Sequence, residues 1–213
     1  MPAAALAAIP TNLITGRRGA GKSSLILHAL KQRPQRVRWA VLVNDLGEIP
    51  VGADGISVSE VAEGCICCTA QLPLRTALTR LLREARPERL LIEASSGART
   101  SEVLRLLADQ WLLPVLALRA TLCVVDPVQF ASFADDEIYA GQIARADVVV
   151  INRTDVAGAA AIAALLRHLS QLSPSPVVVK TQHGVIDLAL LNLPAARVTP
   201  RFRSGEPGHI EER

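Results

Sequence analysis

Short runs of β-branched residues and leucine alternate along the chain with longer segments whose apolar residues recur at helical spacing. This alternation is typical of a parallel sheet whose strands are joined by crossover helices. It predicts strands over residues 12–15, 38–43, 89–92, 121–125, 148–151 and 177–180. It predicts helices over residues 22–31, 72–85, 101–112, 137–144, 158–169 and 186–191. Several strands are almost wholly apolar, which indicates strands buried on both faces.

Composition narrows the class of protein. Half of the 213 residues are apolar and a fifth are charged, which excludes intrinsic disorder. The length suits one domain, expected over residues 1–196, and the Arg-, Glu-, Pro- and Gly-rich stretch 197–213 is expected to be a loose tail. The net charge of +3 comes without a basic stripe, which argues against a nucleic-acid partner. No apolar run reaches the roughly 18 residues of a membrane span, so we expect a soluble cytoplasmic protein without membrane contact.

The first predicted strand leads into a glycine-rich loop that opens the first predicted helix. It reads Gly16-Arg17-Arg18-Gly19-Ala20-Gly21-Lys22-Ser23-Ser24, a full G-x-x-x-x-G-K-S match in the context that confirms a P-loop. Backbone N–H groups of such a loop point at the β-phosphate, and Lys22 places its charge between the β- and γ-phosphates. The Ser23 hydroxyl is expected to bind Mg²⁺, and Ser24 to reach the α-phosphate at the helix N-terminus.

These features predict an α/β fold of the P-loop NTPase type, with a mostly parallel sheet between two helical layers. The phosphate contacts are expected from Gly16, Gly19, Ala20, Gly21, Lys22, Ser23 and Ser24. A glycine-rich turn with an incidental lysine is the alternative, and the flanking strand and helix disfavour it.

A later predicted strand ends in Asn152-Arg153-Thr154-Asp155, close to the guanine-binding N-K-x-D motif. The Asp155 carboxylate can accept hydrogen bonds from guanine N1–H and N2–H, whereas adenine would present an unpaired acceptor there. We expect Asn152 to hydrogen-bond the base and tie this loop to the P-loop, and Arg153 to stack on the base. The motif favours GTP over ATP; an ordinary helix N-cap is the alternative for Asp155.

Acidic residues end two other apolar runs. Glu93 follows a strand, where a P-loop protein places the acid that holds the Mg²⁺ water shell or aligns the attacking water. Glu93 and Lys22 are therefore the candidate catalytic residues, with a solvated strand end as the alternative for Glu93. Asp126 precedes Pro127, which indicates the cap of a turn or helix. Cys123, inside an apolar strand, is expected in the core.

The other three cysteines lie together in Gly64-Cys65-Ile66-Cys67-Cys68. Neighbouring thiols bridge one another poorly, which indicates a reducing compartment and metal binding. Three thiolates can supply most of a tetrahedral site for Zn²⁺ or a similar ion. Without a fourth protein ligand such a site would exchange its metal, which suits delivery. Small buried hydrophobes or a redox pair are the alternatives.

Six motifs occur along this chain in the same order as in a known protein family. They are the P-loop, Asn44-Asp45-Leu46-Gly47-Glu48-Ile49, Gly64-Cys65-Ile66-Cys67-Cys68, Ile92-Glu93-Ala94-Ser95, Val124-Val125-Asp126 and Asn152-Arg153-Thr154-Asp155. With them the chain resembles the CobW family of P-loop GTPases, which are taken to be metal chaperones or insertion factors and are related to the nickel-handling GTPases of hydrogenase and urease maturation. The resemblance covers roughly Leu13 to Leu191.

The resemblance implies roles for residues that the motifs alone do not assign. Asp45 would lie near Mg²⁺ with Ser23 and Glu93, and Glu48 near the carried metal. Cys65, Cys67 and Cys68 would be the site for zinc or cobalt, and an unidentified metalloprotein would be the client.

The chain also departs from the family pattern. The family's N-E-F-G-E is N-D-L-G-E over residues 44–48, which shortens one carboxylate. The family's E-x-S-G reads Glu93-Ala94-Ser95-Ser96, with the glycine one residue later at Gly97. Because that glycine's N–H meets the γ-phosphate in the family, either Ser96 replaces it or the loop has gained a residue, which leaves the hydrolysis rate open. Nothing in residues 1–213 resembles the family's separate C-terminal domain, so either a minimal member of the family or a fragment is expected.

Together these features predict a switch. GTP with Mg²⁺ would order residues 45–48 and 93–97 and thereby reposition the cysteines, so that metal affinity differs between the GTP and GDP states. We expect a slow GTPase that delivers metal. A sensor module that binds nucleotide and metal with little turnover, and a P-loop small-molecule kinase, are the alternatives.

Arg17 stands where deviant P-loops of related proteins carry a lysine that reaches a partner subunit's nucleotide. An arginine finger across a homodimer is therefore one hypothesis. A solvated loop arginine is the alternative.

Overall fold

A single parallel sheet forms the centre of the molecule. The computed structural model describes residues 8–43, 55–61 and 71–196. The strand order is β3-β2-β4-β1-β6-β7-β8, with β5 also paired to β1, and every pairing between these strands is parallel. The strands are β1 (Ile9–Gly16), β2 (Trp39–Val43), β3 (Ile56–Glu60), β4 (Arg89–Glu93), β5 (Leu116–Leu118), β6 (Leu122–Val125), β7 (Val148–Ile151) and β8 (Val177–Lys180).

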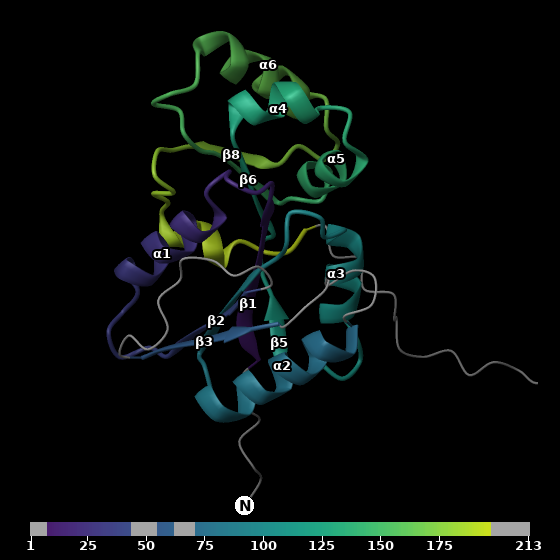
Figure 1. Ribbon diagram of the computed structural model, residues 1–213. Helices are drawn as coiled ribbons and strands as arrows, with labels where there is room; N and C mark the ends of the chain where they lie inside the picture. The colour runs from purple at the N-terminus through teal and green to yellow at the C-terminus, as the bar shows by residue number, and fades with distance from the viewer. Residues whose placement is uncertain (1–7, 44–54, 62–70, 197–213) are drawn as a thin grey trace, which may run out of the picture.

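Helices cover both faces of the sheet (Figure 1). They are α1 (Lys22–Gln32), α2 (Gln71–Ala85), α3 (Thr100–Leu107), α4 (Pro127–Phe133), α5 (Glu137–Ala144), α6 (Ala159–Ser170) and the 3₁₀ helix η1 (Leu188–Asn192). The predicted three-layer α/β fold with a parallel sheet is confirmed.

Alternation along β1 divides the core between the two faces. Ile14 packs in the cluster that contains α1 and η1, whereas Leu13 packs in the cluster that contains α2 and α3. Cys123 on β6 is paired with Thr15, whose side chain points the same way as Leu13. The cluster around Cys123, which contains α4, α5 and α6, therefore lies on the α2 and α3 face. Aliphatic side chains build nearly all of these clusters, as the scarcity of aromatic residues requires.

The predicted pattern lacks three elements that the structure contains. β3 alternates apolar and small polar residues and lies at the end of the strand order, and β5 has only three residues. α4 follows Asp126, whose Oδ1 accepts a hydrogen bond from Val128 N at 2.9 Å, with Pro127 in the first turn. The expected capping role of Asp126 is thus confirmed.

Two predicted helices differ in the structure. The helix expected over residues 101–112 ends at Leu107, because Asp109 Oδ1 accepts a hydrogen bond from Trp111 N at 3.0 Å and turns the chain there. The helix expected over 186–191 is the shorter 3₁₀ helix η1, capped by Asp187. Within the described ranges, no helix has the length and apolar character needed to cross a bilayer. The expected tail, 197–213, lies outside the described residues.

Cys123 offers a test of this packing. The side chain is fully buried, and burial raises the pKa of its thiol to about 12. Because the thiolate is the reactive form, we expect iodoacetamide at pH 7.5 to leave Cys123 unmodified in the native protein. Peptide mass mapping should show full modification only after unfolding in denaturant. Equal labelling of Cys123 in native and unfolded samples would contradict the buried position.

Candidate functional site

The carboxyl ends of the central strands meet at one edge of the sheet. In β1, Ile14 is paired with Glu93 of β4, and Gly16 is paired with Val124 of β6. On β4, Glu93 is also paired with Val43, the last residue of β2. The loops that follow β1, β4, β6 and β7 therefore open side by side, which is where ligands bind in sheets of this type.

The loop after β1 curls over the start of α1. Lys22 is buried, and its Nζ donates to the carbonyl oxygens of Gly16 at 3.1 Å and Arg17 at 3.3 Å. Gly16 and Gly21 both have positive φ angles, and a Cβ at Gly16 would overlap the Val124 carbonyl. The loop thus carries a lysine head at its centre and ends at a helix N-terminus, which is the geometry of an anion site.

Ser23 and Glu93 meet beside this loop. Ser23 Oγ lies 3.0 Å from Oε1 and 3.2 Å from Oε2 of Glu93. Glu93 is only 3% exposed, so the alternative of a solvated strand end is wrong. A hydroxyl and a buried carboxylate are hard oxygen donors of the kind that Mg²⁺ prefers, so these two residues fit the ion expected here.

Asn152 joins the loop after β7 to the P-loop. The side chain is 2% exposed; its Nδ2 donates to Ala20 O at 2.9 Å, and its Oδ1 accepts from Gly184 N at 3.1 Å. A Cβ at Gly21 would overlap the Asn152 amide, so glycine is needed for this approach. The structure contains the expected tie between the two loops; the contact of Asn152 with a base stays a prediction.

Of the remaining residues of this motif, Arg153 and Asp155 are exposed and Thr154 is half-buried. Arg153 has a left-handed φ of 58°, and its Nη1 lies 3.4 Å from Oδ2 of the buried Asp126. Asp155 faces solvent two residues further on. The guanidinium of Arg153 therefore has a partner in its own chain, and stacking of Arg153 on a base stays a prediction.

The loop after β4 forms a braced turn. Ala98 N donates to Ser95 O at 3.1 Å, and the fully buried Gln142 donates from Nε2 to Ser96 O at 3.0 Å and to Ala98 O at 3.1 Å. Gly97 has no positive φ, and a Cβ there would meet no atom within 4 Å. Its glycine is thus not required by sterics in this conformation.

Several predicted site residues lie outside the described residues: Asp45, Glu48, Cys65, Cys67 and Cys68. Their roles stay predictions. Within residues 8–43, 55–61 and 71–196, no three His, Cys, Asp or Glu side chains gather into a possible metal site.

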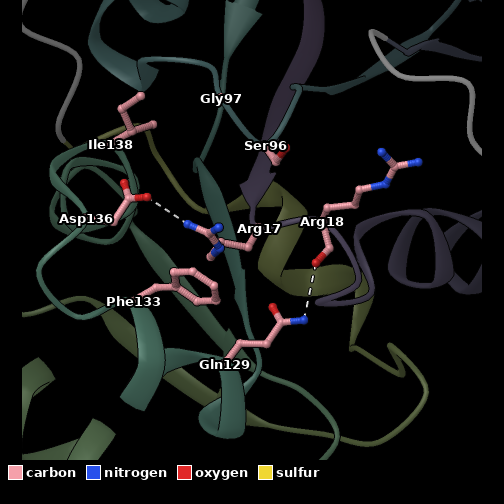
Figure 2. A pocket seen from close by; sticks show the side chains of 8 residues that line it. All are labelled: Arg17, Arg18, Ser96, Gly97, Gln129, Phe133, Asp136 and Ile138. Atoms are coloured by element: carbon pink, nitrogen blue, oxygen red, sulfur yellow. Dashed lines mark hydrogen bonds and ion pairs between the residues drawn. The ribbon is translucent and has the colours of Figure 1, made fainter.

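A pocket of about 390 Å³ lies beside the P-loop (Figure 2). It is lined by Arg17, Arg18, Ser96, Gly97, Gln129, Phe133, Asp136 and Ile138. Arg17 points to Asp136, with 2.8 Å between Nη1 and Oδ2, and Gln129 Nε2 donates to Arg18 O at 3.3 Å. The motifs did not identify Gln129, Asp136 or Gln142. A helix start was the only sequence signal at Asp136, and none marked the two glutamines.

A buried lysine, a serine and a strand-end acid around a glycine-rich loop define a P-loop nucleotide-binding protein. A family model described as the CobW/HypB/UreG nucleotide-binding domain matches residues 10–180. The chain belongs to this family, which confirms the resemblance.

Several relatives share most of this chain. It is 38% identical over 206 residues to the zinc chaperone YeiR of Escherichia coli, with 93% of this chain and 63% of the relative covered. It is 28% identical over 221 residues to the zinc chaperone CobW of a Sinorhizobium species, with 86% and 62% covered. The chain thus spans less than two thirds of the length of these relatives.

Solved structures show the same fold. The Zn(II)-bound YjiA GTPase from E. coli superposes with a TM-score of 0.69 at 24% identity, over 92% of this chain and 67% of that chain. HypB from Helicobacter pylori, solved in complex with nickel, gives a TM-score of 0.56 at 14% identity, over 86% of this chain and 82% of that chain.

Proposed function

We propose that the protein is a GTP-hydrolysing metal chaperone or metal-insertion factor that carries zinc, cobalt or a related divalent ion to a client metalloprotein. The observation that carries the proposal is the contact of Ser23 with Glu93 beside Lys22. The oxygen atoms of Ser23 and Glu93 are of the kind that Mg²⁺ prefers, and they lie beside the P-loop that carries the ammonium group of Lys22. Relatives described as zinc chaperones make zinc the first candidate for the cargo.

The P-loop residues would bind and orient the triphosphate. Lys22 now donates to the carbonyls of Gly16 and Arg17, and it would transfer these hydrogen bonds to the β- and γ-phosphates. Ser23 and Glu93, with Asp45, would hold Mg²⁺, which when bound neutralises charge on the phosphate oxygens. Glu93 would also orient the water that attacks the γ-phosphate.

The three cysteines, with Glu48, would hold the cargo metal. The chain enters residues 44–54 from Val43 and residues 62–70 from Val61, and Val61 N donates to Val43 O at 2.9 Å. Val43 is in turn paired with Glu93. Residues 44–54 therefore follow a residue paired with Glu93, and residues 62–70 follow a residue one strand further away. This arrangement supports coupling between nucleotide and metal. A reducing cytoplasm would keep the thiols free to bind.

The turn after β4 favours a second candidate function. The sequence of this turn differs from the E-x-S-G pattern of the family, because Ser96 stands where the family has glycine. The glycine one residue later, Gly97, does not use glycine-specific geometry. A sensor module that binds nucleotide and metal with little turnover would tolerate this difference.

Single-turnover phosphate release tests the choice between chaperone GTPase and sensor. We expect the protein with GTP and Mg²⁺ to release phosphate, and Glu93→Gln to lower the rate roughly a hundredfold or more, because the amide cannot take or steer a proton in the same way. GDP binding measured in parallel should show that Glu93→Gln still folds and binds. Release no faster than from GTP in buffer would favour the sensor.

Asp155→Asn tests the base. The amide can no longer accept both guanine N–H groups, so we expect GTP affinity to fall roughly ten- to a hundredfold, as the loss of hydrogen bonds to a charged group implies. Xanthosine triphosphate, which has a carbonyl where guanine has its amino group, should gain affinity because the amide N–H₂ can donate to it. Competition against a fluorescent nucleotide measures both.

The matched control is Glu84→Gln, which also neutralises an exposed carboxylate, on α2 and away from the loops. It should leave both affinities unchanged. If Asp155→Asn lowers neither GTP affinity nor the preference over xanthosine triphosphate, Asp155 does not read the base.

Zinc titration in two nucleotide states tests the coupling. We expect zinc affinity to differ roughly 5- to 150-fold between the complexes with GDP and with a non-hydrolysable GTP analogue, the usual range for coupled sites. Zinc should change the affinity for the analogue relative to GDP by the same factor, because linkage is reciprocal. A competing zinc indicator and a fluorescent nucleotide provide the two measurements.

The controls separate the site from the coupling. Replacing Cys65, Cys67 and Cys68 with Ser should abolish tight zinc binding and keep nucleotide binding. Cys123→Ala removes a buried thiol and should leave zinc binding intact. Equal zinc affinities in both nucleotide states would defeat the coupling, and unchanged zinc binding in the triple variant would defeat the site.

A further inference from the structure

Arg17, the second residue of the P-loop, is held inside its own chain. Its Nη1 lies 2.8 Å from Asp136 Oδ2, and its guanidinium carbon lies 3.6 Å from the centre of the Phe133 ring (Figure 2). The side chain keeps 26% of its surface exposed. A short ion pair combined with stacking on an aromatic face fixes both the position and the plane of the guanidinium.

Asp136 also starts a helix. Its Oδ1 accepts a hydrogen bond from Tyr139 N at 2.9 Å and so caps α5, while Oδ2 pairs with Arg17. The hydrogen bond from Tyr139 N lowers the pKa of Asp136, and Arg17 lowers it too, against the opposing effect of burial. Asp136 is therefore ionised at neutral pH, and one carboxylate joins the P-loop to the first turn of α5.

The other end of the connection is the turn after Glu93. Gln142, in the last turn of α5, donates from Nε2 to Ser96 O at 3.0 Å and to Ala98 O at 3.1 Å. α5 thus contacts the P-loop through Asp136 and the turn through Gln142. Because a helix is a stiff element, these contacts set the position of the turn relative to the P-loop.

We propose that Arg17 and Asp136 are a positioning pair that, through α5 and Gln142, fixes the 94–98 turn against the P-loop and so aligns Glu93 and the turn for hydrolysis. The proposal rests on the proposed GTPase function for its effect on rate, and on the described contacts for its effect on the turn. A partly exposed ion pair contributes little to global stability. Its loss should therefore appear in the order of the turn and the rate of the chemical step, and much less in folding or nucleotide binding.

The test uses Arg17→Gln, Asp136→Asn and the double variant. Asn keeps an oxygen that can accept from Tyr139 N, so α5 keeps its cap while the ion pair is lost. We expect each single change to lower single-turnover GTP hydrolysis about tenfold and to change the Kd for GDP less than twofold. The double variant should be no slower than the slower single variant, because both changes remove one interaction.

A second readout does not depend on turnover. In nucleotide-free protein the Ala98 amide, which donates to Ser95 O, should exchange with deuterium about tenfold faster in both single variants, with the β7 amides unchanged. Matched controls are Arg145→Gln, at the exposed C-terminus of α5, and Asp135→Asn, next to Asp136. Both should leave hydrolysis and exchange at the wild-type level.

The outcomes are separable. Unchanged exchange at Ala98 in both single variants overturns the positioning pair whether or not the protein hydrolyses GTP. Absence of hydrolysis in the wild-type protein, with faster exchange in the variants, defeats the proposed GTPase alone. Single effects on rate that multiply in the double variant also overturn the pair. A loss in Arg17→Gln that depends on protein concentration, with no effect of Asp136→Asn, would instead indicate an arginine finger across a dimer.

Discussion

The register of β1 between β4 and β6 is the constraint on which the site depends. Pairing Ile14 with Glu93 and Gly16 with Val124 puts the P-loop next to the end of β4. Because all the described strands run in one direction, their following loops share one edge. Glu93 is buried there, and a buried carboxylate needs polar partners. Ser23, in the first turn of α1, supplies one, so the sheet register itself creates the proposed Mg²⁺ site.

Much of the fold could be predicted because strands that are buried on both faces consist of apolar residues, and such runs are visible in the sequence. β7 and β8 have the predicted bounds, yet only β7 is buried on both faces. Val177 and Val178 of β8 are 47% and 37% exposed, since β8 ends the strand order and no described strand lies beyond it. An apolar run therefore identifies a strand, but its place in the sheet follows from topology. β3 and β5 were missed because a weakly apolar alternation and a three-residue strand give little local signal.

The candidate site also contains residues that the sequence identifies and residues that only the structure identifies. The P-loop, Glu93 and Asn152 were found because their chemistry lies in contiguous motifs that follow strands. Other contacts join residues far apart in the sequence: Asp136 is 119 residues from Arg17, Gln142 is 46 residues from Ser96, and Gln129 is 111 residues from Arg18. No local pattern could indicate these contacts. Asp136 before a helix predicts a cap for one carboxylate oxygen. Only the tertiary structure shows that the other oxygen holds Arg17.

The segment from Asp126 to Gln142 contacts three loops that are proposed to bind different parts of a nucleotide. Asp126 pairs with Arg153 beside the proposed base site, Gln129 holds the carbonyl of Arg18 in the P-loop, and Gln142 braces the turn after Glu93. On the other side of Glu93, the ends of β2 and β3 lead into the segments with the predicted switch and metal ligands. Glu93 therefore lies between a turn that Gln142 braces and the ends of β2 and β3, from which the chain enters the segments proposed to bind metal.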